Sequence, residues 1–478
     1  MKNPAKLKSP MSKSTEDNPQ TPWQVSKLEE LEKNKQAIYF DIDDFLEVVE
    51  FYIYQGKYKR ALEIAEYAIR VHTGDTHLML KKAQLLASLN NETQALGILN
   101  ELAIVDPNNS DIYLTKGAIH SQLRNYLLAI DEYLLALPNA EEPDYIYLSI
   151  AFEYENMGNY SNAIEFLDKA LKANPDNHLA LYELAYCFDL LGMNEESVAY
   201  FEKLIDGNPY NKEAWFNLGA SYNNAGLYEK GIEAFDYALA IDDQHKNSWF
   251  YRGLSFTLLE KFSEALESFL HSIEDDEGDA VKYYHIGECY EKLEQFSTAL
   301  ENYRKATVLD HTLADAWAGM GVCEMEAGNT GKAIRHFVRG AELDPNNVSY
   351  ICLLADAYAT AGDIQRAQDT YEKAVAEQPT DAECWTEYAD ALWRNDLRKE
   401  ALQVSQRALE ILPTNSTILY RIAAFMWLTG NENDATYFLM VAIEQNYDEH
   451  KALLSAFPVL ETHERFLKIV EQHKFPLQ

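Results

Sequence analysis

A period of 34 residues runs through most of this chain and constrains its fold more than any other feature. When Ile42 is taken as place one of repeat 1, place eight is glycine or alanine in every later repeat, and place twenty is always small. Glycine, alanine and serine make up about a quarter of an average protein, so chance does not produce this. Place eight reads Val49, Ala83, Gly117, Ala151, Ala185, Gly219, Gly253, Gly287, Gly321, Ala355, Ala389 and Ala423. Place twenty reads Ala61, Ala95, Ala129, Ala163, Ser197, Gly231, Ala265, Ala299, Ala333, Ala367, Ala401 and Ala435.

Bulky apolar residues recur with the same period. Within a repeat, places four, seven, eight and eleven follow the spacing of one helix face, and places twenty, twenty-four and twenty-seven follow that of a second. Glycine often separates the two patterns, as expected where a helix ends. Place four reads Phe45, Met79, Tyr113, Tyr147, Leu181, Trp215, Trp249, Tyr283, Trp317, Ile351, Trp385 and Leu419. Six repeats end with proline, at Pro107, Pro175, Pro209, Pro345, Pro379 and Pro413, where a helix cannot continue.

Twelve consecutive repeats over residues 42–449 closely resemble the tetratricopeptide repeat, which has this distribution of small, bulky and proline places. The stretch from Ala214 to Asp243, AWFNLGASYNNAGLYEKGIEAFDYALAIDD, shows the pattern well. The resemblance implies an all-α fold, a right-handed superhelical α-solenoid of stacked antiparallel helix hairpins. It is weakest in the first repeat, with Val49 at place eight, and in the last, with Tyr447 instead of proline.

The ends of the chain lie outside the repeats. Residues 1–22 are rich in Lys, Ser, Pro and Asn, and we expect a disordered tail. Residues 23–41 are expected to form one polar helix with Leu28, Leu31, Ile38 and Phe40 on its apolar side. Residues 450–478 are interpreted as two short helices, interrupted by Pro458, that cap the last hairpin.

Charge restricts the classes of partner. The formal net charge is −36, and seven Lys against six Asp or Glu give residues 1–41 about +1, so the remainder carries about −37. Such a surface repels phosphate backbones and anionic headgroups, so nucleic acid and membranes are poor partners. It favours encounter with basic protein segments, although the charge could also serve solubility alone.

No stretch has the roughly 20 apolar residues of a membrane helix, and the lysine-rich N-terminus has no apolar run behind it. We therefore expect neither membrane insertion nor a secretory signal peptide, and a cytoplasmic location.

The sequence contains no motif that predicts catalysis. The phosphate loop GxxxxGK[ST], the zinc helix HExxH and the nucleophile elbow GxSxG are missing, so we expect neither an enzyme nor a cofactor. Cys187, Cys289 and Cys323 occupy place ten, an inward position where cysteine serves as a small apolar residue. His285 lies four residues before Cys289, but two ligands make no structural zinc site, so no metal is expected. The acidic run 274–277 is interpreted as a solvated turn.

The resemblance also implies a binding groove, lined by places two, five, nine and twelve of the first helices. Carboxylates beside aromatic rings would favour Lys or Arg in the partner. In repeats 4 to 8 the aromatic and apolar residues at these places are Tyr145, Leu148, Phe152, Tyr182, Tyr186, Phe216, Phe250 and Tyr284. The acids are Glu155, Asp189, Glu213, Glu288 and Glu291, and Asp356 and Asp390 continue the series.

Place five is often aromatic in this family for packing alone, which leaves Phe152 and Tyr186, at place nine, as the stronger candidates. We expect a non-catalytic scaffold or adaptor that binds basic and apolar peptide segments in the groove. The alternative is a regulatory or transport receptor that captures one peptide signal and forms oligomers. The oligomeric state and the identity of the partner are left open by the sequence.

Overall fold

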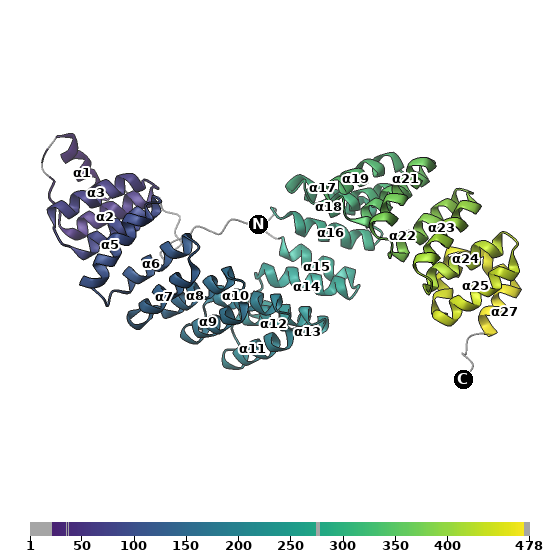
Figure 1. Ribbon diagram of the computed structural model, residues 1–478, viewed down its shortest axis with the longest axis horizontal. Coiled ribbons are helices and arrows are strands. Elements are labelled where there is room, and N and C mark those ends of the chain that lie inside the picture. Colours follow the sequence, from purple (N-terminus) through teal and green to yellow (C-terminus); the bar gives the residue numbers. More distant parts are fainter. Residues whose placement is uncertain (1–21, 35, 37, 274–277, 473–478) are drawn as a thin grey trace. The chain divides into compact units, whose positions relative to one another are not determined.

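The computed structural model describes residues 22–34, 36, 38–273 and 278–472, and within these ranges all regular structure is helical, with no strand (Figure 1). The chain forms two compact units, Met1–Ala225 and Gly226–Gln478. The helices of the first unit are α1 (Trp23–Lys33), α2 (Ile42–Tyr54), α3 (Tyr58–Val71), α4 (Thr76–Ser88), α5 (Glu92–Val105), α6 (Ser110–Gln122), α7 (Tyr126–Ala136), η1 (Leu137–Asn139), α8 (Pro143–Asn156), α9 (Tyr160–Ala173), α10 (His178–Leu190), α11 (Asn194–Gly207) and α12 (Lys212–Asn224).

The second unit continues the alternation. Its helices are α13 (Tyr228–Ile241), α14 (Lys246–Leu258), α15 (Phe262–Ser272), α16 (Ala280–Lys292), α17 (Phe296–Leu309), α18 (Ala314–Glu326), α19 (Thr330–Leu343), α20 (Val348–Thr360), α21 (Ile364–Glu377), α22 (Ala382–Arg394), α23 (Arg398–Ile411), α24 (Ser416–Leu428), α25 (Glu432–Gln445), η2 (Tyr447–Glu449), α26 (His450–Ala456), η3 (Pro458–Thr462) and α27 (Glu464–Gln472).

Within each unit, consecutive helices pair and each pair packs on the next, so an even-numbered helix α2 to α24 is the first helix of a repeat. First helices of adjacent repeats also contact one another, as α10 does α12 and α20 does α22. The predicted all-α solenoid of stacked helix hairpins is confirmed.

Small and large residues inside a hairpin are matched in size. A Cβ atom added to Gly253 would lie 2.6 Å from the ring of Phe269, and one added to Gly287 would lie 2.7 Å from Tyr303. In these two repeats glycine at place eight therefore leaves the room that the ring occupies, because real Cβ atoms do not approach so closely. Repeats 5 and 10 instead combine alanine at place eight, Ala185 and Ala355, with a ring at place twenty-four. Repeat 1 reverses the sizes, with Val49 at place eight and Ala65 at place twenty-four, both fully buried.

Tryptophan at place four fixes the turn between hairpins. The indole N–H of Trp215 donates to the carbonyl oxygen of Pro209 at 2.9 Å, and that of Trp385 donates to Pro379 at 2.9 Å. Trp249 makes the same bond, six residues back, to Asp243. Trp385 is buried, whereas Trp215 and Trp249 are half-buried. In each case the partner of the indole N–H is a carbonyl in the turn after the preceding helix has ended.

The N-terminal helix is shorter than predicted, since α1 ends at Lys33 rather than near residue 40. Ile38 and Phe40 lie outside it in a segment held by side chains of repeat 1. The Tyr67 hydroxyl donates to the carbonyl oxygen of Ile38 at 2.9 Å, and a ring nitrogen of His72 lies 2.8 Å from that of Phe40. These bonds satisfy backbone groups that a continuing helix would have used itself.

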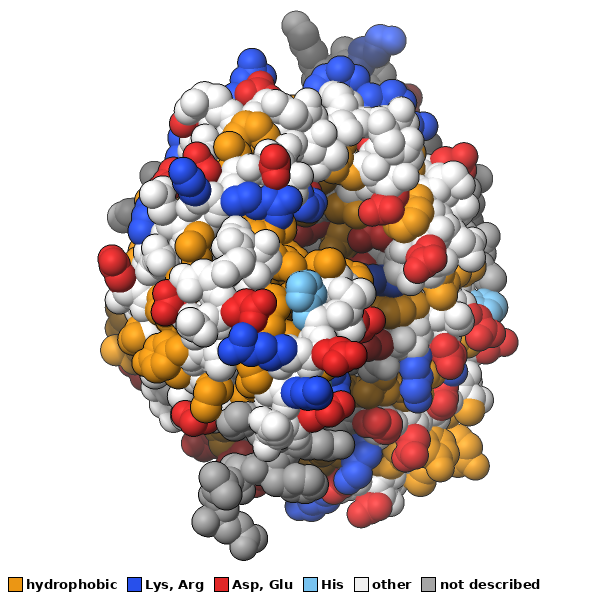
Figure 2. Space-filling view, turned by 90° about the vertical axis from the view of Figure 1, so that its right-hand side faces the viewer, with side chains coloured by type: hydrophobic (Ala, Val, Ile, Leu, Met, Phe, Trp, Pro, Cys, Tyr) orange, Lys and Arg blue, Asp and Glu red, His pale blue; other side chains and the backbone are white. Residues whose placement is uncertain are grey.

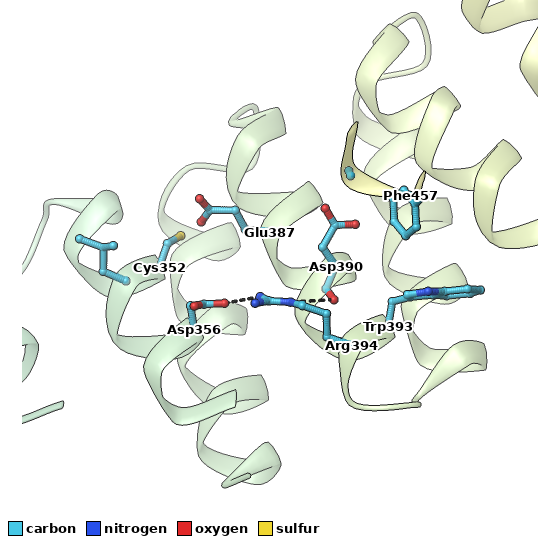
Figure 3. A pocket seen from close by; sticks show the side chains of 9 residues that line it. Cys352, Asp356, Glu387, Asp390, Trp393, Arg394 and Phe457 are labelled. Carbon is cyan, nitrogen blue, oxygen red and sulfur yellow. Dashed lines mark hydrogen bonds and ion pairs between the residues drawn. The ribbon is translucent and has the colours of Figure 1, made fainter. Parts of the chain in front are cut away.

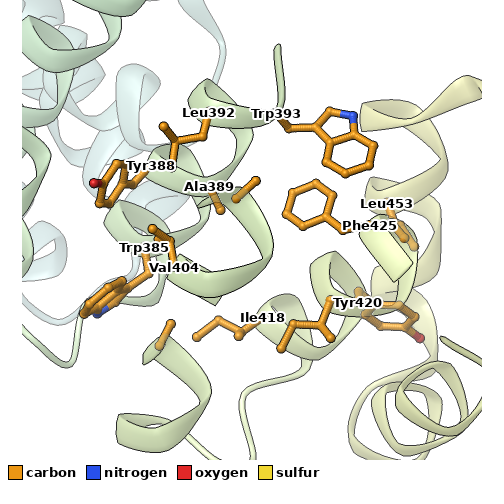
Figure 4. Packing of buried hydrophobic residues seen from close by; sticks show 14 of the residues in the cluster. Trp385, Tyr388, Ala389, Leu392, Trp393, Val404, Ile418, Tyr420, Phe425 and Leu453 are labelled. Atoms are coloured by element: carbon orange, nitrogen blue, oxygen red, sulfur yellow. The ribbon is translucent and has the colours of Figure 1, made fainter. Parts of the chain in front are cut away.

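The last repeats contain an extensive apolar cluster (Figure 4). The ring of Trp393 stacks on that of Phe425, with centroids 4.4 Å apart, and both meet Phe457 edge to face. Phe457 lies between α26, which packs against α24, and η3. Phe466 of α27 is fully buried against Trp427. The segment after residue 449 thus covers apolar side chains of the final hairpin.

Candidate functional site

Three tyrosine rings stand open on the first helices of repeats 4 and 5. Tyr145 of α8 is 48% exposed, and Tyr182 and Tyr186 of α10 are 59% and 45% exposed. Phe152 of α8 is half-buried. Exposed aromatic rings are common anchors for partner side chains.

Two carboxylates of the same helices, Glu155 of α8 and Glu183 of α10, are near enough to each other and to Tyr186 for their charges to interact. Glu155 accepts a weak hydrogen bond from the Cys187 thiol, with sulfur and oxygen 3.6 Å apart. Desolvation, then the charge of Glu183, raises the pKa of Glu155 to about 7, and desolvation also raises the pKa of Glu183. Neither carboxylate has a lysine or arginine partner within the described ranges. This acidic pair, Glu155 and Glu183, therefore leaves negative charge unbalanced by the protein.

Other residues expected to line the groove are occupied by packing. Leu148 and Phe216 are buried, at 4% and 8% exposure. In the second unit the Phe250 ring contacts that of Phe269 at 5.6 Å, and the Tyr284 ring contacts that of Tyr303 at 5.9 Å. These four side chains occupy place five, where packing alone accounts for an aromatic or apolar residue.

The remaining acids expected in the groove make bonds within the protein or lie half-buried. Asp189 accepts from the Asn224 side-chain amide at 2.8 Å. Glu288 lies 3.0 Å from Nδ1 of His285, and Glu291 accepts from the Tyr303 hydroxyl at 2.8 Å. Glu213 is half-buried in the first turn of α12. The structure thus brings together Glu155, Glu183 and Tyr186 in the first unit and, separately, Tyr284, Glu288 and Glu291 in the second.

A cavity of about 350 Å3 lies on the first helices of repeats 10 and 11 and is closed on one side by Phe457 (Figure 3). Arg394 forms an ion pair with Asp356, and Nε of Arg421 lies 2.9 and 3.0 Å from the two carboxylate oxygens of Asp390. The third carboxylate, Glu387, has a pKa of about 7 because of desolvation and the nearby charges of Glu383 and Asp356. The chain itself thus supplies two cations to three carboxylates.

Family models described as tetratricopeptide repeat match residues 52–119, residues 150–212 and 191–246, and residues 232–414. Together they extend over most of the twelve predicted repeats. The chain belongs to the tetratricopeptide repeat family.

Solved structures of other proteins are similar to parts of this tetratricopeptide repeat chain. MamA is 20% identical over 35% of this chain and 97% of its own, with a TM-score of 0.33. YrrB, described as a TPR protein with an unusual peptide-binding site, is 22% identical over 41% of this chain and 97% of its own, with a TM-score of 0.35. The APC/C hetero-tetramer Cut9-Hcn1 is 14% identical over 85% of this chain and 99% of the other, with a TM-score of 0.43. No curated protein matches the chain.

The four places used to locate the tetratricopeptide groove missed two acids. Glu183 and Glu387 both occupy place six, which was not counted as groove-facing. A comparison of place six along the repeats could have identified Glu183 and Glu387, because most other repeats have a residue other than glutamate at this place. The pairing of Asp356 and Asp390 with arginines was also not foreseen, since it joins different repeats.

The cysteines and acids outside this site show no metal-binding arrangement. In the described ranges, no group of three or more His, Cys, Asp or Glu side chains is placed to hold a metal ion. Cys187, Cys289 and Cys323 are buried, as place ten predicts. The acidic run 274–277 lies outside the described residues. No described helix is both long and apolar enough to span a bilayer. Figure 2 shows carboxylate side chains spread over one face among apolar and basic ones.

Proposed function

We propose that this tetratricopeptide repeat protein is a non-catalytic scaffold that binds a basic and apolar segment of a partner protein on the first helices of repeats 4 and 5. The observation that carries the proposal is the acidic pair, Glu155 and Glu183, which has no cation partner among the described residues and interacts with the exposed Tyr186. The best-exposed part of the surface is in repeats 4 and 5. Five buried, unbridged cysteines are consistent with a reducing compartment such as the cytoplasm.

The chemistry of this surface favours a lysine or arginine next to an apolar residue. A cation between Glu155 and Glu183 would relieve their repulsion and lower both raised pKa values. The faces of Tyr182 and Tyr186 would hold the cation's alkyl stem and add a cation–π contribution of roughly 0.5–1 kcal/mol each. Because Glu155 carries a proton below about pH 7, binding should strengthen as the pH rises through that value.

The first experiment uses the full chain as bait in lysate of its source organism, at low and moderate salt, with retained proteins identified by mass spectrometry. Synthetic segments from the basic partners are then titrated against the wild type and against Glu155→Gln/Glu183→Gln. We expect binding to weaken about tenfold in this variant and to fall with salt. The same loss is expected for Phe152→Ala/Tyr186→Ala with the helical content unchanged.

The matched control is Glu195→Gln/Glu196→Gln, which removes two carboxylates from the first turn of α11, a second helix of its pair. It changes net charge equally and should leave affinity unchanged. Equal weakening by both double variants would reduce the effect to overall charge and contradict the groove. Titration also gives the stoichiometry, because a scaffold holds several partners at once and a receptor holds one.

A further inference from the structure

The second helix of repeat 3, α7, is apolar on both of its faces. Its inner face buries Ala129, Ile130, Tyr133 and Ala136. Its outer face has four leucines, which we call the leucine stripe: Leu127, Leu128, Leu134 and Leu135, which are 62%, 50%, 42% and 56% exposed. The pairs are seven residues apart, so the stripe follows one side of the helix for two turns. The proposed groove uses first helices, so this is a different surface.

The other repeats lack the first leucine pair of this stripe. The first two stripe residues occupy places eighteen and nineteen, and in all eleven other repeats these places are polar or glycine. Those residues are Lys59, Arg60, Thr93, Gln94, Ser161, Asn162, Glu195, Glu196, Glu229, Lys230, Ser263, Glu264, Ser297, Thr298, Gly331, Lys332, Gln365, Arg366, Lys399, Glu400, Asn433 and Asp434. The solenoid therefore folds without apolar residues here, and packing within a repeat does not account for the leucines. A contiguous apolar patch rimmed by polar residues is typical of an interaction site.

We propose that the leucine stripe binds an amphipathic helix of a partner protein that has a lysine or arginine among its apolar residues. A stripe along one helix presents ridges and grooves that a second helix can fill, as neighbouring helices of the solenoid do. The basic residue is required by Asp131, which is exposed between the two leucine pairs, and by the lack of any lysine or arginine in α7. Apolar contact and charge thus select the same ligand.

A second copy of this chain fits the stripe poorly. In a twofold-symmetric contact centred on the stripe, each leucine pair would meet the opposite pair of the partner copy, and Asp131 would face its own symmetry mate. Two carboxylates would then be desolvated together, in chains whose formal net charge is −36 each. A partner with a basic residue at that point replaces this repulsion by attraction.

Residues 1–21 of the same chain also fit poorly. They include four lysines, but Leu7 is their one branched aliphatic side chain, and Pro4 and Pro10 interrupt any helix on either side of it. Such a segment cannot present leucine-sized residues at i, i+3 and i+7 against the stripe.

The test uses two fluorescein-labelled helical peptides of about 18 residues, a length that supports a helix. Both peptides have a stripe of leucines along one face. The residue at the centre of the stripe is lysine in the first peptide and glutamate in the second. Fluorescence anisotropy is measured with the full chain and with a variant in which α7 takes the residues of repeat 4, Leu127→Ser/Leu128→Asn/Leu134→Asp/Leu135→Lys. We expect the lysine peptide to bind the wild type about tenfold or more tightly than the variant, and more tightly than the glutamate peptide.

Two controls make the result specific. Leu258→Ser removes an exposed leucine of another repeat and should leave binding unchanged. Asp131→Lys should reverse the preference between the two peptides, and circular dichroism confirms that each variant remains folded. Equal binding to wild type and variant would overturn the proposal. So would a wild-type dimer that the variant converts to a monomer, or binding that requires removal of residues 1–21, since these assign the stripe to a second copy or to the chain's own tail.

Discussion

Two regions on the first helices gather carboxylates in opposite ways. In repeats 4 and 5, Glu155 and Glu183 interact with each other, and no lysine or arginine of the described part of the chain pairs with either. In repeats 10 and 11, Asp356 and Asp390 are each paired with an arginine, and Glu387 is the third acid of the cavity. Both regions have a glutamate with a pKa of about 7, Glu155 in the first and Glu387 in the second.

The difference is one of charge balance: the chain supplies cations to the acids of repeats 10 and 11 but not to the acidic pair of repeats 4 and 5. Arg421 and Asp390 are 14% and 24% exposed, so this pair is a partly buried contact that ties α22 to α24. Removal of one partner from such a pair leaves an uncompensated charge in the protein. The acidic pair in repeats 4 and 5 already has that uncompensated charge, and a basic partner segment would neutralise it.

Replacement of Arg421 by alanine should lower the free energy of unfolding by about 3 kcal/mol, because Asp390 is then desolvated without its cation. Urea unfolding, followed by circular dichroism, measures the change. Asp390→Asn in the same background should recover part of the loss, which a double-mutant cycle makes quantitative. A loss under about 1 kcal/mol would mean that this pair is no more structural than an exposed one.

The acidic pair should make stability fall as the pH rises. Glu155 has a pKa of about 7 in the folded state, and its unfolded value is about 4.3. Between these values the folded state retains a proton that the unfolded state has released, so stability declines through this window and the loss is complete above pH 7. We expect roughly 2 kcal/mol, allowing for partial exposure.

Hydrogen exchange of the α8 and α10 amides at pH 5 and pH 8 measures that decline locally, which suits a solenoid that unfolds by segments. Glu155→Gln should remove most of it. If Glu155→Gln still loses as much stability between pH 5 and pH 8 as the wild type, the pH dependence comes from other titratable groups.

An arginine placed in repeat 5 should make the acidic pair of repeats 4 and 5 more like the arginine-paired acids of repeats 10 and 11. Leu190 occupies place thirteen, where repeat 11 has Arg394, and it is 45% exposed. In Leu190→Arg the pKa of Glu155 should fall, and the affinity for a basic segment should weaken about threefold because the protein now supplies its own cation. NMR titration of the Glu155 carboxyl and peptide binding measure the two effects. Leu190→Gln is the uncharged control and should change neither.

Replacement of Arg394 by alanine should have the smallest effect, about 0.5 kcal/mol, although Arg394, like Arg421, forms an ion pair with an aspartate that lines the cavity. Its side chain is 57% exposed, so water screens the interaction. The pKa of Glu387 should rise further, because Arg394 is the cation that lowers it. Thermal unfolding and a carboxyl titration test both, and a loss as large as that of Arg421→Ala would contradict the role assigned to exposure.

The sequence predicted the hairpins well because their determinants are local. Small residues at places eight and twenty, and proline after the second helix, act within about 34 residues of one another. The prediction made the N-terminal helix too long. Ile38 and Phe40 are held outside it by Tyr67 and His72, which belong to the next hairpin. Place numbers alone also could not distinguish exposed Tyr182 from buried Phe216, since both occupy place five.

The sequence by itself therefore determined the helical repeat, its family and the acidic character of the chain, because periodicity and composition are properties of single repeats. The tertiary structure decided which carboxylates meet a cation and which do not. Both kinds of interaction form between side chains of adjacent repeats. The ion pair of Arg421 with Asp390 is one example, and the repulsion between Glu155 and Glu183 is the other. The energy of each interaction depends on distance and desolvation, which exist only once the hairpins have stacked.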